Sequence, residues 1–322
     1  YVHSNRKGDV MLKYVLKRLG YILVTLWVIV TCTFFMMKNL PGTPFDAERF
    51  SIMTPQQQER VLEMYGLNDS LPMQYVKYIK NMLKGDLGTS FTYVNQDVSK
   101  VITGRLGPSA LIGIQAVLIG LAIGLILGIL AAWKHNSGID YFTMILAVLG
   151  VSVPNFVAAA LLQYYIGLKW GALPVGFWTG WNCSVLPSIA LSFSATAMVA
   201  RFMRTEMLDV LDQDYIVTAR AKGLSQMKVL MRHAVRNSIL PVVTILGPIV
   251  VNLMTGSLAV ENIFSIPGIG SLFVDCIKAN DYPVIMGITI FYAAFYMLIV
   301  LLVDLAYSLI DPRIRLAKGK ES

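Results

Sequence analysis

The sequence predicts an all-α polytopic membrane protein with six transmembrane helices. Hydrophobic residues make up 56% of the chain, charged residues make up 14%, and the mean hydropathy is +0.61. This composition is too apolar for a soluble domain of such length. A helix needs about 20 apolar residues to cross a bilayer. Six stretches qualify, and they are 12–37, 108–133, 141–168, 185–202, 239–260 and 284–310.

The basic residues predict which side of the membrane holds the two termini. Six spans place both termini on one side. If that side is the cytoplasm, the inner segments hold 17 of the 27 Lys and Arg residues, and most of the others fall in one long outer loop. Basic residues accumulate in cytoplasmic segments, and long loops count little in this rule. We therefore expect cytoplasmic termini, and the basic pI indicates topology rather than nucleic-acid binding.

The expected organisation follows from these spans. Residues 1–10 differ in character from the membrane sequence that begins at Met11, so a tag remnant or a disordered extension is expected there. The parts that follow are a first transmembrane helix (11–38), an extracellular loop with short helices (39–104), a five-helix transmembrane core (105–310) with a cytoplasmic coupling loop (205–238) and an outer re-entrant segment (261–283), and a cytoplasmic tail (311–322).

The long outer loop contains two predicted helices. In the first, Thr54 is the expected N-cap, Pro55 occupies the first helical position and Gly66 follows the last turn. The second is amphipathic, so it suits a membrane surface, a partner or its own protein equally well. Its apolar face holds Tyr75, Tyr78, Ile79 and Met82, and its basic face holds Lys77, Lys80 and Lys84.

Glycines and a proline mark two of the spans. Gly120, Gly124 and Gly128 recur every four residues, which lets another helix approach closely. Whether that helix belongs to this chain is open at this point, with the same chain favoured. In the third span Pro154 interrupts the helix, with polar groups on either side at Ser152 and Asn155. Such a break either lines a cavity or serves packing.

Nothing in the sequence predicts catalysis or a bound cofactor. The chain lacks the G-x-x-x-x-G-K-[ST] phosphate loop, and its three histidines are scattered. Cys183 and Cys276 both fall on the outer side, and their pairing is left open. Asp304 lies in the last span, where hydrogen bonding between helices is favoured over a transport role. A secondary transporter needs more ionisable groups near the midplane than this one.

The predicted cytoplasmic loop is a polar, basic segment between two apolar ones. Its helix-capping residues and its glycine predict two short helices. Asp212 and Asp214 are expected to cap the first, and Gly223 to end it. Ser225 is expected to cap the second. The second helix should bury Met227, Leu230, Met231, Ala234 and Val235, and present Lys228, Arg232 and Arg236 on another face.

This loop resembles the EAA loop of permease subunits in binding-protein-dependent ABC importers. Ala219 and Ala221 flank Arg220, Gly223 matches the glycine of the motif, and Pro241 matches its closing proline. Two positions depart from the general motif, with Asp214 in place of Glu and Ser238 in place of Ile. Further stretches resemble the first permease of oligopeptide and dipeptide importers, namely MLKYVLKRLGYILVT, LPGTPFD, QYVKYIKNMLKGDLGTSF, VSVPNF, VENIFSIPGIGSLFVD, DYPVIMG and DLAYSLIDPRIR.

The resemblance implies a type I importer permease in a bacterial plasma membrane. Its implied partners are a homologous second permease, two cytoplasmic ATPase subunits that bind ATP and Mg, and an extracellular peptide-binding protein. An importer of nickel or another small solute is the alternative. The implied sites are an ATPase-coupling helix (Asp214, Tyr215, Thr218, Ala219, Arg220, Ala221, Lys222 and Gly223), a translocation path (Ser152, Pro154 and Asn155) and an outer re-entrant turn (Pro267, Gly268 and Gly270).

Overall fold

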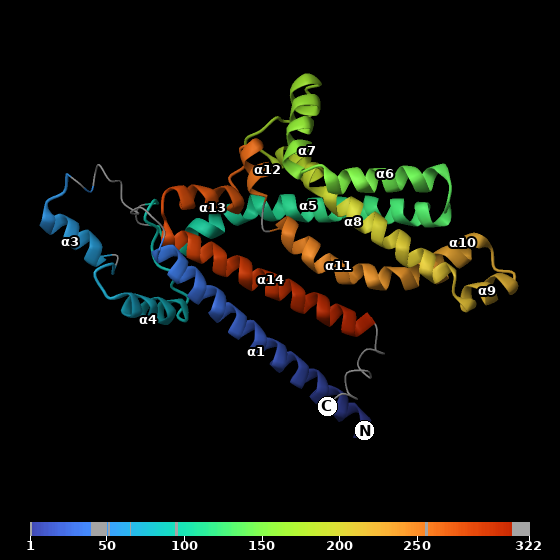
Figure 1. Ribbon diagram of the computed structural model, residues 1–322, viewed down its shortest axis with the longest axis horizontal. Coiled ribbons are helices and arrows are strands. Elements are labelled where there is room, and N and C mark those ends of the chain that lie inside the picture. Colours follow the sequence, from blue (N-terminus) through green and yellow to red (C-terminus); the bar gives the residue numbers. More distant parts are fainter. Residues whose placement is uncertain are drawn as a thin grey trace. The chain divides into compact units, whose positions relative to one another are not determined.

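Helices dominate the computed structural model (Figure 1), which describes residues 2–39, 50, 52–64, 66–93, 96–254 and 257–310. Within these residues the one β pairing is an isolated bridge between Thr89 and Asp97. The all-α prediction is therefore confirmed. The chain divides into two compact units, each treated by itself below. Unit 1 is Tyr1–Gly107 with Leu272–Met297, and unit 2 is Pro108–Ser271 with Leu298–Ser322.

Five helical stretches in the described part of the chain are long and apolar enough to cross a membrane, and a bent pair of helices would make a sixth. This agrees with the six predicted spans. The five are Lys17–Lys38, Val98–Trp133, Trp181–Leu211, Gln226–Ile263 and Tyr282–Val303.

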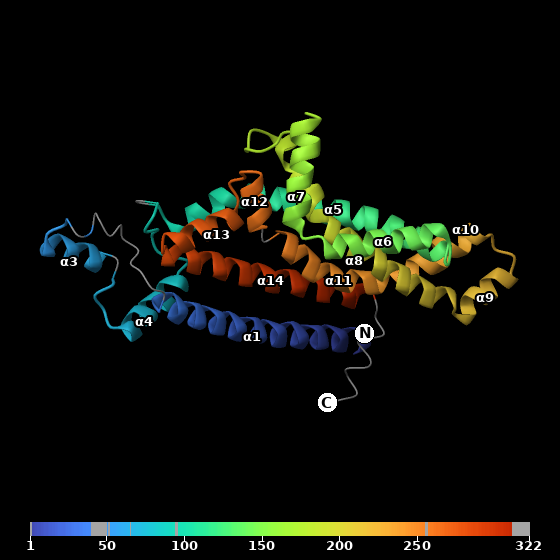
Figure 2. The ribbon, with the colours of Figure 1, turned by 45° about the horizontal axis from the view of Figure 1, so that its top comes forward.

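The third predicted span is broken rather than kinked. Helix α6 (Gly138–Ser152) and helix α7 (Asn155–Leu162) meet at 101°, and α7 continues into a π-helix, η1 (Gln163–Lys169). Val153 has an extended backbone, with φ −81° and ψ 118°. The proline ring clashes with a helical residue before it, so the predicted interruption at Pro154 becomes a sharp turn of the chain. The steep departure of α7 from α6 is visible in both views (Figures 1 and 2).

Helix α8 (Val185–Leu211) is the centre of unit 2, and a short 3-10 turn, η2 (Trp181–Ser184), precedes it. It packs against α6, α7 and helix α11 (Arg236–Met254). Met203 and Met207 on α8 are fully buried in the resulting core. Since α8 runs unbroken to Leu211, it joins this core to the polar loop that follows.

The glycine stripe of helix α5 (Val98–Trp133) also packs on α8, which settles the question left open by the sequence. A Cβ atom built on Gly120 would lie 2.7 Å from the Cβ of Ala195. One on Gly124 would lie 2.8 Å from the Cβ of Val199. Real side chains do not approach so closely, so only glycine permits this contact. The predicted close packing is confirmed, and the partner belongs to the same chain.

Unit 1 contains helices α1 (Val2–Lys38), α3 (Pro55–Met64) and α4 (Leu71–Met82). Helix α1 begins at Val2, within residues 1–10, for which a tag remnant or a disordered extension was expected. A helix propagates easily once nucleated, because each added residue gains one hydrogen bond. The LPGTPFD stretch (40–46) and the tail (311–322) lie outside the described residues.

The two predicted outer-loop helices are confirmed. The amide of Gln57 donates to the Thr54 hydroxyl, and the Gln57 side chain accepts from the Thr54 amide at 2.9 Å, which forms a capping box. Gly66 follows the helix with φ +66°. On α4 the predicted apolar face packs on α1, where the hydroxyls of Tyr75 and Thr31 lie 2.7 Å apart. The amphipathic helix therefore packs on its own protein.

A buried carboxylate closes unit 1 at the start of helix α14 (Tyr282–Ile310). Asp281 accepts hydrogen bonds from the Ser90 hydroxyl (2.5 Å) and the Thr92 amide (3.0 Å). Gly287 follows on α14, where a Cβ atom would lie only 2.4 Å from Val98. The GDLGTSF and DYPVIMG stretches, which are far apart in sequence, therefore pack together.

Candidate functional site

The predicted coupling residues form one short helix that stands at the end of α8. Helix α9 (Asp214–Ala221) begins three residues after α8 ends at Leu211. At its other end Gly223 has φ +77°, and its amide donates to the Arg220 carbonyl at 3.0 Å. A left-handed residue after a helix is the usual position of glycine. The prediction that Gly223 ends this helix is confirmed.

The side chains predicted to cap the two helices of this loop make no capping hydrogen bonds. Gln213 is the N-cap of α9 and makes no side-chain capping bond, so neither Asp212 nor Asp214 serves as the cap. Asp214 lies in the first turn, where its charge still favours the positive helix end. Ser225 does take the N-cap position of helix α10 (Gln226–Val229), but its hydroxyl makes no capping bond either. Exposed polar side chains of this kind are satisfied by water instead.

Helix α9 has one buried face and one exposed face. Ile216 is completely buried and Ala219 nearly so, packed against Val229 and the end of α8. Tyr215 and Val217 are 43% and 58% exposed. The Tyr215 hydroxyl accepts a hydrogen bond from the Asn237 side chain at 3.0 Å, which fixes that ring to the start of α11. The remaining predicted coupling residues lie on the exposed surface or at the helix end, namely Asp214, Thr218, Arg220, Ala221, Lys222 and Gly223.

The second helix of the loop buries only part of the predicted face, because Leu230, Ala234 and Val235 pack on the core but the two methionines do not. Met227 and Met231 are 51% and 53% exposed, whereas Val229, Leu230 and Ala234 are buried. The prediction assumed a uniform α-helix, but η3 (Leu230–Val235) is a π-helix, and its wider turn changes which residues face the core. The basic residues on the other face, Lys228, Arg232 and Arg236, are exposed as predicted.

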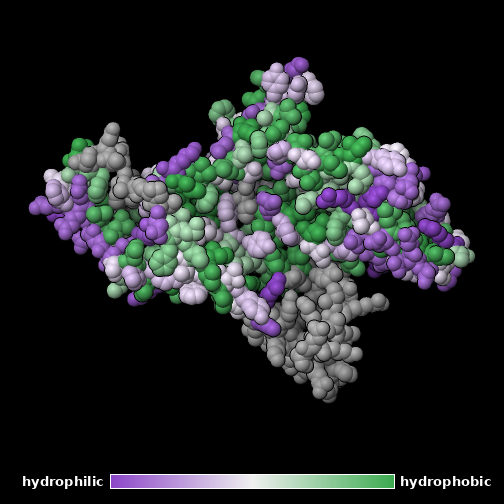
Figure 3. Space-filling model, viewed as in Figure 1, coloured by the Kyte–Doolittle hydropathy of each residue, from purple (hydrophilic) through white to green (hydrophobic). Residues whose placement is uncertain are grey.

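The end of unit 2 therefore carries apolar side chains in a hydrophilic setting. Figure 3 shows the region of α9 and α10 as largely hydrophilic. Within it, several large apolar side chains are exposed at the surface. They are Tyr215, Val217, Leu224, Met227 and Met231.

A buried ion pair, which the sequence reasoning missed, fixes the α5–α6 turn to α8. The Arg204 guanidinium donates two hydrogen bonds to the Asp140 carboxylate, at 2.5 Å and 2.8 Å. The carboxylate also accepts from the Asn136 amide at 3.0 Å and contacts the His135 ring. Asp140 is 1% exposed. The available signal was a lone acid, Asp140, just after the short turn KHNSG, and two arginines inside the apolar part of α8, Arg201 and Arg204.

Ser238 adds a second link between the loop and the core. Its buried hydroxyl contacts the Ala234 carbonyl at 2.9 Å and the Glu206 carbonyl of α8 at 3.3 Å. This is the position where the sequence departs from the EAA motif. A hydroxyl at this point replaces an apolar contact by a hydrogen bond between α8 and α11.

The predicted outer turn surrounds a buried glutamate, which the sequence reasoning also missed. In helix α12 (Leu258–Ile263), the Glu261 carboxylate accepts from the Ser109 hydroxyl at 2.7 Å and the Ser271 amide at 2.9 Å. A Cβ atom on Gly268 would lie 2.3 Å from that carboxylate. Pro267 and Gly268 lie in the turn, but Gly270 lies inside helix α13 (Ile269–Lys278), which corrects its predicted place.

The three predicted path residues lie at the α6–α7 break. Ser152 ends α6 and is exposed, Pro154 precedes α7 and is exposed, and Asn155 begins α7 and is half-buried. The predicted coupling residues, path residues and outer-turn residues thus lie at three separate places in unit 2.

The two outer cysteines and Asp304, which the sequence analysis singled out, do not form a further site in the described part of the chain. Cys183 and Cys276 are both buried free thiols. The side chain of Asp304 lies outside the described residues. No group of three or more His, Cys, Asp or Glu side chains in the described part of the chain is placed to hold a metal ion.

Family models match almost the entire chain. Residues 11–108 match the N-terminal region of the membrane components of binding-protein-dependent transport systems, and residues 124–316 match the binding-protein-dependent transport system inner membrane component.

Full-length relatives and one solved structure are similar to the chain. The dipeptide transport system permease protein DppB of Lactococcus lactis is 46% identical and covers 95% of this chain and 100% of the relative. DppB of Bacillus subtilis is 43% identical, and the match covers 96% of this chain and 99% of the relative. The oligopeptide transport system permease protein OppB of Escherichia coli is 38% identical, and the match covers 95% of this chain and 100% of the relative. The structure of an amino acid ABC transporter with histidines has a TM-score of 0.50 at 20% identity, covering 67% of this chain and 94% of that one. At that identity the likeness concerns the fold alone.

Proposed function

This chain belongs to the family of binding-protein-dependent transport system inner membrane components, and we propose that it is one permease subunit of an ATP-driven importer of dipeptides or oligopeptides. The observation that carries the proposal is the 46% identity to a dipeptide permease over the full length of that relative. The alternative of nickel or another small solute has no support of this kind.

Helix α9 is the element through which the permease receives work from an ATPase. The chain has no phosphate loop, so the nucleotide and its Mg belong to partner subunits. A short helix with a buried face and an exposed surface of mixed polarity suits insertion into a groove of another protein. Tyr215 and Val217 supply the apolar contact. Arg220 and Lys222 add charge at its edge.

Movement of α9 passes to the transmembrane core through α8. The joint between α9 and α8 is short, and Ile216 packs directly on the end of α8. From there the Asp140–Arg204 pair attaches α6, and the glycine stripe of α5 leaves no space for sliding. Helices α5, α6 and α8 therefore move as one body, which rocking between inward-open and outward-open states requires.

The assembly contains three further kinds of subunit. A homologous second permease completes the transmembrane pathway, two ATPases bind on the cytoplasmic side, and an extracellular protein delivers peptide. The surplus of Lys and Arg in the α9 loop supports a cytoplasmic position for that loop and for both termini. Each ligand drives the cycle only by the difference in its affinity for the two conformations.

The α6–α7 break belongs to the peptide pathway, and the re-entrant turn belongs to the outer side of the permease. The exposed break at Ser152, Pro154 and Asn155 offers polar groups beside the peptide path. The turn at Pro267 and Gly268 with Gly270 in the following helix forms the outer re-entrant segment, and Glu261 holds its shape.

Substitution of an exposed residue of α9 tests this function. Val217→Glu places a charge in the proposed contact without disturbing the buried face, so the chain should remain folded in the membrane. We expect loss of ATPase co-purification in mild detergent and loss of ATP-driven peptide uptake in proteoliposomes. Gly223→Arg should have the same effect, because a side chain at φ +77° strains the end of the helix.

The matched control is Gln213→Glu, which adds the same charge at an exposed position just before α9. It should retain both ATPase and uptake. Unchanged uptake and unchanged co-purification in Val217→Glu would contradict the assignment of α9. Uptake of a solute other than peptide by the intact complex would contradict the substrate class while leaving the coupling role in place.

A further inference from the structure

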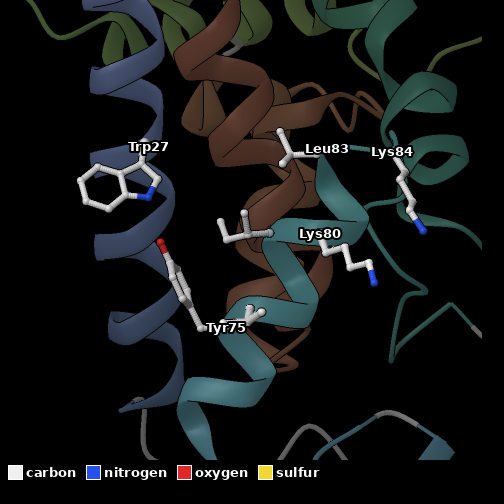
Figure 4. A pocket seen from close by; sticks show the side chains of 7 residues that line it. Trp27, Tyr75, Lys80, Leu83 and Lys84 are labelled. Atoms are coloured by element: carbon white, nitrogen blue, oxygen red, sulfur yellow. The ribbon is translucent and has the colours of Figure 1, made fainter.

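Helices α1 and α4 of unit 1 touch at one level and leave a groove next to it. The contact consists of the Tyr75–Thr31 hydrogen bond at 2.7 Å and the stacking of the Tyr75 and Phe35 rings, whose centroids are 5.7 Å apart. One helical turn along each helix, at Trp27 and Ile79, a cavity of about 480 Å³ replaces the contact (Figure 4). Pockets for small ligands have volumes in the range of about 300–1,000 Å³.

The groove is apolar, and one of its walls belongs to a membrane helix. Trp27 lies within the candidate span Lys17–Lys38, and only 11% of the most apolar window of that span is buried in the protein. The opposite wall is formed by α4 and its C-cap, where Val76 and Leu83 are 58% and 78% exposed. A groove with this composition beside a lipid-facing helix presents the right surface for a hydrocarbon chain.

Two lysines give the rim of this groove a positive charge. Lys80 lies on α4 and Lys84 follows four residues later, just past the end of the helix; their ammonium groups extend away from Trp27 (Figure 4). Neither has an ion pair in the described part of the chain, whereas Lys77 on the same helix pairs with Asp69 at 2.5 Å. Like charges at this spacing repel slightly. A phosphate beside both would relieve that repulsion while the lysine stems remain against apolar surface.

We propose that this groove binds an anionic phospholipid. One acyl chain occupies the space between Trp27 and Ile79, and the phosphate lies beside Lys80 and Lys84. The apolar interior accounts for the chain, and the charge of the rim accounts for an anionic headgroup over a neutral one. Bound lipid would brace α4 against α1 one helical turn away from the Tyr75–Thr31 hydrogen bond.

Native mass spectrometry of the full chain, purified with its partners in mild detergent, tests the proposal. The complex is incubated with phosphatidylglycerol or with phosphatidylcholine. We expect retained phosphatidylglycerol, and Lys80→Gln with Lys84→Gln should weaken its binding by about fivefold per lysine, roughly 25-fold together. The control is Lys77→Gln with Lys100→Gln, which removes two lysines that are paired with Asp69 and Asp97. The control should bind as the parent does.

A second pair of variants tests the apolar part. Val76→Trp fills the groove from an exposed position, so both lipids should be lost, whereas Met73→Trp on the same helix lies outside the groove and should have no effect. Equal retention of phosphatidylglycerol by the parent and the Lys80/Lys84 variant would overturn the proposal. So would equal binding of the two lipids by the parent. A photo-crosslinker at position 83 should capture lipid, and capture of a protein subunit would overturn it as well.

Discussion

Unit 2 buries two carboxylates, Asp140 and Glu261, and stabilises them by different means. Asp140 faces a full opposite charge, with the Arg204 guanidinium bonded to both of its oxygens. Glu261 has neutral donors instead, the Ser109 hydroxyl and the Ser271 amide, in a turn that closes around it. Both arrangements join distant elements, since Glu261 links the α12 turn to α5 through Ser109 and to α13 through Ser271. An opposite charge stabilises Asp140, whereas neutral donors and close enclosure by the turn stabilise Glu261.

Removing one partner of the ion pair should have the largest effect. Asp140→Ala leaves the Arg204 cation partly buried without its counter-charge, which costs about 3–5 kcal/mol. We expect a clear drop in the melting temperature of the purified complex. Asp140→Ala combined with Arg204→Met should recover most of this loss, because no unpaired charge then remains. Failure of the double variant to recover would mean that packing, not charge, dominates at this position.

The turn around Glu261 should respond to volume instead of charge. In Gly268→Ala the new Cβ atom lies 2.3 Å from the carboxylate, and overpacking of this kind costs about 1–3 kcal/mol. The same substitution in a Glu261→Ala background should cost much less, since the clashing group is gone. Thermal melting of the four proteins in this double-mutant cycle gives the coupling. Independent, additive costs would contradict the proposed enclosure.

A buried acidic group that has neither an opposite charge nor hydrogen-bond donors beside it should stay neutral. Cys276 in unit 1 is an example. Burial, reinforced by the negative charges of Asp281 and Asp275, raises the pKa of its thiol to about 12. The thiol therefore remains protonated well above its usual range near pH 8.5. With Cys32 and Cys183 changed to Ser, labelling of the folded protein by iodoacetamide should be far slower than labelling of the denatured protein at every pH from 7 to 9, because the thiolate fraction stays minute. The rate for denatured protein should begin to level off near pH 9, and a similar levelling in the folded protein would contradict the assignment.

The exposed hydrogen bond of α9 should matter least for stability. Tyr215→Phe removes the bond to Asn237 at a half-exposed position, so the expected loss is under about 1 kcal/mol. Co-purification of the ATPase should persist, because the ring remains. Tyr215→Ala should keep stability within the same range but weaken the ATPase contact. Melting temperatures and ATPase yield separate the two effects, and equal ATPase loss in both variants would assign the contact to the hydroxyl instead of the ring.

Local rules succeeded where the neighbouring residues alone decide the outcome. The Thr54 cap, the glycine end at Gly223 and the extended residue before Pro154 depend on backbone geometry within a few residues. The exposure of Met227 and Met231 could not be predicted in this way. It depends on a π-helix, whose wider turn arises from packing rather than from composition.

The sequence by itself determined the class of this protein, because membrane insertion depends on runs of apolar residues and on charge that remains outside the bilayer. It also located α9, since a polar island between spans must reach water. Only the tertiary structure decided which carboxylates are buried and what stabilises them. Asp140 meets Arg204 across 64 positions, and Glu261 meets Ser109 across 152. Contacts at such separations depend on how helices pack, and a single sequence carries no local signal for them.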